Sequence, residues 1–163
     1  MKYILPIFLI TCIIFLACRP ELKIEPTTTE SPSTSIVFDS MLATKLGADE
    51  YGMRQYVLAF LKAGPNRDQD STETAQLMRK HLDNIKRMAE EGKLAVAGPF
   101  LDEGDIRGIY IFNVKTIEEA KALTETDPAI QEGRLIMELH PWYGSAGLMT
   151  VNEVHKKIAK NKI

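Results

Sequence analysis

The chain has 163 residues, of which 45% are apolar and 26% are charged, so length and composition predict one globular domain with its own core. Acidic and basic residues nearly balance, 22 against 20, which excludes nucleic acid as the main partner because phosphate binding requires a concentrated basic face. The two cysteines, Cys12 and Cys18, lie in the first apolar segment, so the rest of the chain has no disulfide, thiolate nucleophile or cysteine metal ligand.

Residues 1–17 have the pattern of a bacterial export signal. Lys2 precedes an apolar run over 4–16, which is shorter than the roughly 20 apolar residues of a membrane span. The run ends at Leu16-Ala17-Cys18, which resembles a bacterial lipobox and implies cleavage before Cys18 and acylation of its thiol. Acyl chains would then anchor the protein to the cell envelope, at the outer membrane where the cell has one. The alternatives are acylation at Cys12, an uncleaved helical anchor, or a plain signal cut elsewhere.

Residues 18–50 are expected to connect this signal to the domain. The segment 25–35 is rich in threonine, serine and proline and has no apolar residue apart from two prolines, so it cannot build a core and predicts a disordered tether. The mildly apolar segment 36–46 predicts a short helix or a packed lead-in. Gly47 and Gly52 then bracket a polar loop.

The domain is expected over 51–148 and begins with a strand over 54–62. A polar loop follows, in which Arg67 is a candidate for binding an anionic substrate group, the alternative being a solvated loop arginine. Ser71 or Thr72 can cap a helix that runs to about residue 91 and stops at Gly92. The helix is expected to turn five apolar side chains toward the core: Ala75, Met78, Leu82, Ile85 and Ala89.

A second strand is predicted over 93–101 and a third over 106–114, joined as a hairpin by a turn at 103–105. Gly98 and Pro99 fall inside the second strand, where proline cannot donate a hydrogen bond to the ladder. This pair predicts either a bulge beside a site, with Gly98 and Pro99 near the substrate, or an ordinary edge strand.

The second half of the domain repeats the order of strand and helix. Thr116 and Glu119 form a capping box that begins a helix. Asp127 can cap a further short helix with Pro128 in its first position. A fourth strand is expected over 134–142. The tail 149–163 is basic and predicts a terminal helix over 151–162, with solvated lysines in preference to a nucleic-acid or lipid contact.

The order βαββαβ predicts an α+β, ferredoxin-like fold: a four-stranded antiparallel sheet with helices on one face. The first strand is apolar on both of its faces, because Tyr56 and Leu58 alternate with Val57 and Ala59. Helices can cover only one face of this sheet. We therefore expect a homodimer that forms through the open face.

Several segments, in this order, resemble the YCII-related family of dimeric α+β barrels over residues 51–148. They are the helix with His81, the strand Ala97-Gly98-Pro99-Phe100-Leu101-Asp102, the segment Thr126-Asp127-Pro128 and the closing Leu139-His140-Pro141-Trp142. The resemblance implies a dimeric barrel and a His–Asp dyad, which transfers onto His81 and Asp102. A related member is a dehydrochlorinase of a hydroxylated aromatic ring, and muconolactone isomerases share the barrel.

The candidate chemistry is general acid–base catalysis by His81, because an imidazole can exchange a proton at neutral pH, with Asp102 orienting the ring. The alternatives are a structural histidine at the border of the apolar face and an aspartate that serves only the turn. His140 and Trp142 could line the mouth of a pocket. The spacing of the histidines and acids does not resemble a zinc motif, and no cofactor motif is present, so we expect neither metal nor cofactor.

Two functions follow from these patterns. The first is an envelope-anchored lyase or isomerase that acts on an unidentified small molecule. The second is a non-catalytic ligand-binding or structural dimer at the same place.

Overall fold

The computed structural model describes residues 37–161. The expected signal peptide, the lipid site at Cys18 and most of the tether lie outside these residues. A short helix, α1 (Ser40–Leu46), comes first, capped by Asp39 and ended by Gly47 in the left-handed conformation at φ 65°. It confirms the helix expected in the lead-in. No helix in the described range is long and apolar enough to cross a membrane.

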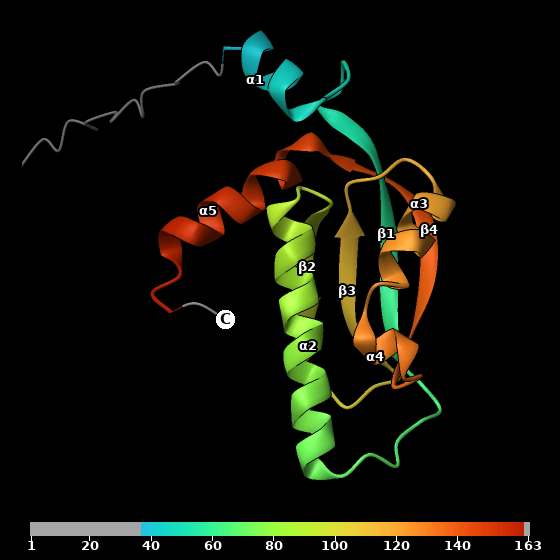
Figure 1. The fold of residues 1–163 in the computed structure, drawn as a ribbon. Helices are drawn as coiled ribbons and strands as arrows, with labels where there is room; N and C mark the ends of the chain where they lie inside the picture. Colours follow the sequence, from blue (N-terminus) through green and yellow to red (C-terminus); the bar gives the residue numbers. More distant parts are fainter. Residues whose placement is uncertain (1–36, 162–163) are drawn as a thin grey trace, which may run out of the picture. The chain divides into compact units, whose positions relative to one another are not determined.

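A four-stranded antiparallel sheet in the order β2-β3-β1-β4 forms the centre of the domain (Figure 1). Its strands are β1 (Met53–Ala63), β2 (Leu94–Pro99), β3 (Ile106–Phe112) and β4 (Leu135–Ser145). The helices α2 (Ser71–Glu90), α3 (Ile117–Thr124) and α4 (Pro128–Gln131) complete the βαββαβ order. This arrangement confirms the ferredoxin-like α+β fold. β4 extends three residues beyond the predicted strand.

The two faces of β1 pack against different layers. Val57, Ala59 and Leu61 face the helices and belong to a core with Leu77 and Met88 of α2. On the opposite face, β1, β2 and β3 contribute a second buried cluster: Tyr56, Ala95 and Ile111. The chain itself covers that second cluster, because residues of the 3₁₀ turn η1 (Ala146–Thr150) pack against it: Leu148 and Met149.

The N-cap of helix α2 is Asp70, which was not the predicted cap. Its carboxylate accepts hydrogen bonds from the backbone N–H groups of Thr72 and Glu73. The Glu73 carboxylate in turn accepts a hydrogen bond from the Asp70 N–H. Aspartate is at least as good a cap as the predicted Ser71 or Thr72, and here both arms of a capping box form. At the other end Gly92 has φ 68°, as expected for the residue that ends the helix.

The core-facing side of α2 is rotated from the predicted one. Its buried residues are Leu77, His81, Asn84 and Met88, whereas Ala75 is exposed and Ile85 is only half-buried. The prediction failed because it selected apolar residues, while the centre of the buried face contains a histidine and an asparagine. A pair of polar residues can occupy that position because hydrogen bonds satisfy most of their polar atoms.

Of the two alternatives for Gly98-Pro99, the structure shows the ordinary edge strand and no bulge at these residues. Gly98 pairs with Ile109 and Pro99 with Gly108 in regular register, and the β2–β3 register shifts instead between Leu94 and Val96. Proline is tolerated at the end of β2 because β2 is an edge strand.

The capping box of Thr116 and the Asp127 cap were both confirmed. The tail contains the expected helix as α5 (Val151–Ile158).

Candidate functional site

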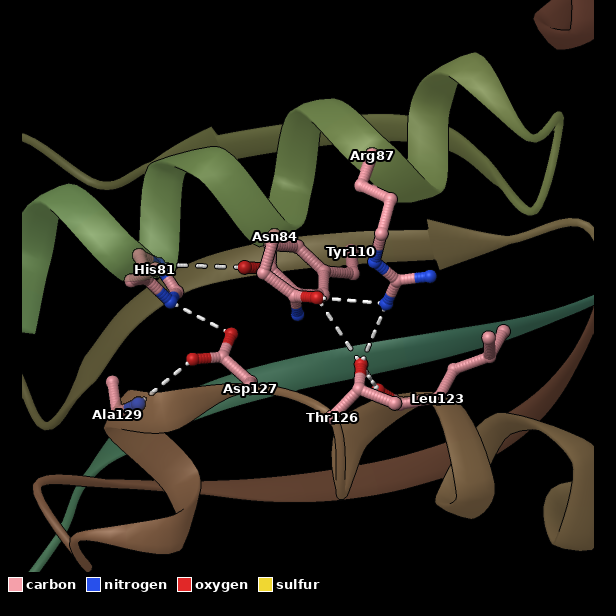
Figure 2. A network of polar contacts seen from close by, with 8 residues as sticks. All are labelled: His81, Asn84, Arg87, Tyr110, Leu123, Thr126, Asp127 and Ala129. Atoms are coloured by element: carbon pink, nitrogen blue, oxygen red, sulfur yellow. Dashed lines mark hydrogen bonds and ion pairs between the residues drawn. The ribbon is translucent and has the colours of Figure 1, made fainter.

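His81 lies in the middle of α2, on the side that faces the sheet. Only 6% of its surface is exposed, although histidine is usually an intermediate or surface residue. Burial of an imidazole requires polar partners, since an unpaired ring nitrogen in a protein interior costs free energy. Both ring nitrogens of His81 have such a partner (Figure 2).

The first partner is Asp127, which is fully buried. The His81 Nδ1 atom lies 2.7 Å from Asp127 Oδ2. The other carboxylate oxygen, Oδ1, accepts a hydrogen bond from the Ala129 N–H at 2.9 Å and so caps α4. The cap holds the carboxylate in place, because Asp127 cannot rotate without losing the start of α4. When the Asp127 carboxylate accepts from Nδ1–H, the lone pair of the imidazole lies on Nε2.

The second partner is Tyr110 of β3, whose hydroxyl lies 3.4 Å from His81 Nε2. The two rings stack at a centroid distance of 6.2 Å. Burial raises the pKa of Tyr110 far above its ordinary value, and the nearby charge of Asp127 raises it further. Tyr110 is therefore a neutral hydroxyl at physiological pH and can donate a hydrogen bond to Nε2.

A second set of polar contacts fixes the segment that contains Asp127. Arg87 Nη2 donates to Asn84 Oδ1 at 2.8 Å and to Thr126 Oγ1 at 2.9 Å. Thr126 Oγ1 also donates to the Leu123 carbonyl at the end of α3. Figure 2 shows that these contacts bridge α2 and the α3–α4 connection next to the His81–Asp127 pair. They position Asp127 but do not reach the imidazole.

Asp102 is not the residue that contacts His81. It is exposed in the turn between β2 and β3, and its carboxylate lies beside Gly104. Among the residues that the structure describes, His81 hydrogen-bonds with Asp127 and Tyr110. The predicted dyad therefore had the right histidine position for a His–Asp contact but the wrong aspartate. Asp127 lies in Thr126-Asp127-Pro128, where the sequence pattern predicts a helix cap and gives no sign of a contact with His81.

The other predicted site residues do not gather around His81. His140 and Trp142 lie on β4 opposite Leu58 and Tyr56, so they belong to the face of the sheet away from the helices. His140 is exposed, with Nε2 2.9 Å from Glu138 Oε1, and Glu138 also pairs with Lys62. The sheet thus separates these residues from His81.

Arg67 is exposed in the β1–α2 loop. Partial desolvation lowers the pKa of its guanidinium, and the positive charges of Arg134 and Arg107 lower it further. Three arginines therefore concentrate positive charge near this loop, which is compatible with the predicted anion contact. Gly98 and Pro99 occupy the edge strand β2, with Pro99 exposed.

Two properties limit the chemistry at the His81–Asp127 pair. Within the described range no group of three or more histidine, cysteine or acidic residues could hold a metal ion. A cleft of about 340 Å³ lies elsewhere and is lined by residues such as Arg54, Lys115 and Tyr143. With 6% of its surface exposed, His81 presents little of its ring to a substrate in this conformation.

Comparison with known proteins finds a family model and a solved structure that are similar to the domain. A family model described as the YCII-related domain matches residues 56–143, more than half of the chain. A solved structure of 5-chloro-2-hydroxyhydroquinone dehydrochlorinase from Burkholderia phenoliruptrix, in complex with 2,5-dihydroxybenzoquinone, is similar at 18% identity and a TM-score of 0.40. The alignment covers 53% of this chain and 92% of that one. No curated protein matches the chain.

Proposed function

The chain belongs to the YCII-related family, and from that premise we propose that its domain is a small-molecule enzyme of the lyase or isomerase type in which His81 transfers a proton. The observation that carries the proposal is the buried contact of 2.7 Å between His81 Nδ1 and Asp127 Oδ2. Such a pair is the usual arrangement of a general acid–base histidine that a carboxylate orients.

Each residue has a separate part in the proposed reaction. Asp127 orients the imidazole and stabilises the imidazolium that forms when Nε2 accepts a proton from a carbon or hydroxyl of the substrate. Tyr110, held neutral by its raised pKa, gives up its contact with Nε2 and can donate a hydrogen bond to a developing oxyanion. The Arg67 loop supplies positive charge for an anionic substrate group.

A second candidate function is a non-catalytic ligand-binding or structural module. The burial of His81 favours it, because a ring that is 6% exposed cannot reach a substrate without rearrangement of the helix layer. In that case the pair serves as a polar connection between α2 and α4. The two candidates differ in whether a small molecule binds at His81 and reacts there.

A ligand screen by thermal shift tests whether His81 belongs to a small-molecule site, which the proposed enzyme requires and a purely structural module does not. We expect at least one compound from a panel of small phenolics, lactones and organic acids to raise the melting temperature of the full-length chain, because a ligand that binds only the folded state stabilises it. The shift should be lost in His81→Asn and kept in His155→Asn, which changes an exposed histidine of α5. A panel in which no compound gives a shift that depends on His81 would contradict the catalytic proposal.

We also propose that the protein is exported and anchored to the bacterial envelope through acylated Cys18. The support is the order of charge, apolar run and Leu16-Ala17-Cys18 in the sequence. Mass spectrometry of the mature protein should find an acylated N-terminal Cys18. An unmodified N-terminus at any other residue would exclude the lipid anchor.

A further inference from the structure

β1 begins at the end of the sheet where β3 and β4 end (Figure 1). The residues around a cleft of about 340 Å³ come from this end of the sheet. This volume is within the range of small-molecule sites in proteins. The residues that line it include Asp49, Arg54, Gln55, Lys115 and Tyr143. A smaller hollow of about 160 Å³ shares Gln55, Lys115 and Tyr143 and adds the side chains of Tyr56 and Trp142. The two hollows thus form one groove with a polar half and an aromatic half.

The polar half contains a half-buried cation whose charge is not neutralised. Arg54 donates to two neutral acceptors, the Leu46 carbonyl at 2.7 Å and Asn113 Oδ1 at 2.6 Å. Its Nε atom is buried and has no hydrogen-bond partner among the residues that the structure describes. A guanidinium removed from water without a counter-ion is costly, so the site favours an anion.

The other charged groups of the groove do not compensate Arg54. In the described part of the chain the ion pairs involve neither Arg54 nor Lys115. The Asp49 carboxylate accepts from the Tyr143 hydroxyl and from the backbone N–H groups of Tyr51 and Met53. These contacts hold the pKa of Asp49 below its ordinary value, with the Tyr143 hydroxyl as the largest cause. Asp49 therefore keeps its negative charge in the cleft, and the charges of Arg54 and Lys115 exceed it by one, which leaves the lining net positive.

The aromatic half is formed around Trp142. Its ring lies 5.8 Å from that of Tyr56, at an interplanar angle of 38°. Gly144 allows this position, because a Cβ atom at residue 144 would come within 2.3 Å of the Trp142 ring. The absence of a side chain at Gly144 leaves the indole lying along the strand, where it forms a flat wall of the groove.

We propose that this groove binds a small aromatic carboxylate, with the carboxylate at Arg54 and Lys115 and the ring against Trp142. The site is separate from the His81–Asp127 pair. Tyr110, which contacts His81, pairs with Ala59 of β1, four residues and roughly 13 Å along the strand from Gln55. The match to the family model begins at residue 56, so Asp49 and Arg54 are contributed by a segment outside it.

Trp142 provides a direct test, because it is the only tryptophan of the chain. Titration of the full-length protein with sodium benzoate should change its intrinsic fluorescence in a saturable manner below about 10 mM. Benzyl alcohol, which has the ring without the charge, and acetate, which has the charge without the ring, should each bind at least about tenfold more weakly than benzoate. Lys115→Glu should weaken benzoate binding by about tenfold or more, because it reverses one of the two charges.

Two control variants separate this site from other effects. Lys80→Gln, which removes an exposed charge from α2, should leave the dissociation constant of benzoate within about twofold. His81→Asn should also bind benzoate like the wild type, so the two sites can be tested independently. Arg54→Gln should abolish binding in a protein whose circular dichroism is native. If this variant unfolds, Lys115→Glu decides the question. The absence of a saturable response, equal affinity for benzoate and benzyl alcohol, or unchanged affinity in Lys115→Glu would overturn the proposal.

Discussion

His81 and Asp127 are 46 residues apart in the sequence and 2.7 Å apart in the folded chain. The contact joins the middle of one helix to the first turn of another, and both side chains are buried. Because burial of either group alone is costly, each stabilises the placement of the other. The pair is thus part of the fold as well as the candidate site.

Substitution of Asp127 and of Asp102 tests which of the two aspartates is the structural partner of His81. Asp127→Ala should lower the free energy of unfolding by roughly 3 kcal/mol, because it leaves His81 without its partner and α4 without its cap. Asp102→Ala, in an exposed turn, should change it by less than about 0.5 kcal/mol. Urea unfolding of both variants gives the comparison, and similar losses would contradict the assignment of Asp127.

Tyr110 makes stability depend on alkaline pH. Its pKa is raised in the folded state, so the folded protein holds the phenolic proton more tightly than the unfolded chain. The resulting stabilisation is complete below the unfolded pKa of about 10 and is lost as the pH rises above it. Tyr110→Phe should therefore lose less stability than the wild type between pH 9 and pH 11, as measured by urea unfolding. Parallel losses would show that Tyr110 does not titrate in this way.

At the scale of elements, α2 shows how far the sequence could predict the structure. Arg79, Lys80 and Lys86, which lie outside the predicted core-facing set, are all exposed. The buried side was displaced, because apolar periodicity assigns no weight to a histidine and an asparagine that obtain their partners from α4 and from Arg87. Those partners are distant in sequence, so the identity of Asp127 could not follow from local pattern.

The strands were predicted well because their pattern is local. β1 alternates apolar side chains on both faces, and the turn before β3 has the composition of a hairpin. The covering of Tyr56 by Leu148 and Met149 was missed, because nothing in the tail indicates on which face of the sheet it folds back. Sequence patterns identified the elements and left the contacts between them open.

The rotation of the buried face of α2 can be measured directly. Met88 has no exposed surface and contacts the main core, whereas Met78, which the apolar pattern favoured, is half-buried. Met88→Ala should destabilise the protein by roughly 3 kcal/mol through loss of contacts and creation of a cavity. Met78→Ala should cost less than about 1.5 kcal/mol. A larger loss of stability in Met78→Ala than in Met88→Ala would show that the predicted face of α2 is the buried one.

At the scale of the whole molecule, we expect the domain to form a homodimer through the open face of its sheet. η1 covers the end of that face near Tyr56, but Leu58, Phe60 and Ile109 are only half-buried on it. A continuous apolar strip on a sheet is usually covered by a partner. Such a partner could also complete the route to a buried site.

Sedimentation at micromolar concentration tests this assembly. The wild-type chain should sediment as a dimer, and Phe60→Glu should sediment as a monomer, because association would bury its charge. Lys86→Glu, on the exposed side of α2, is the matched control and should remain dimeric. A monomeric wild type would remove the expected interface.

The central claim, that His81 transfers a proton with the help of Asp127, is tested most directly by deuterium exchange. Full-length protein is incubated in D₂O with the phenolics, lactones and organic acids of the ligand panel, and mass spectrometry records the incorporation of deuterium at carbon. The account predicts that the wild type labels at least one compound, that His155→Asn labels it equally, and that His81→Asn and Asp127→Asn lose roughly 100-fold or more of the rate. Equal labelling by His81→Asn, or no labelling of any compound whose binding requires His81, would contradict it.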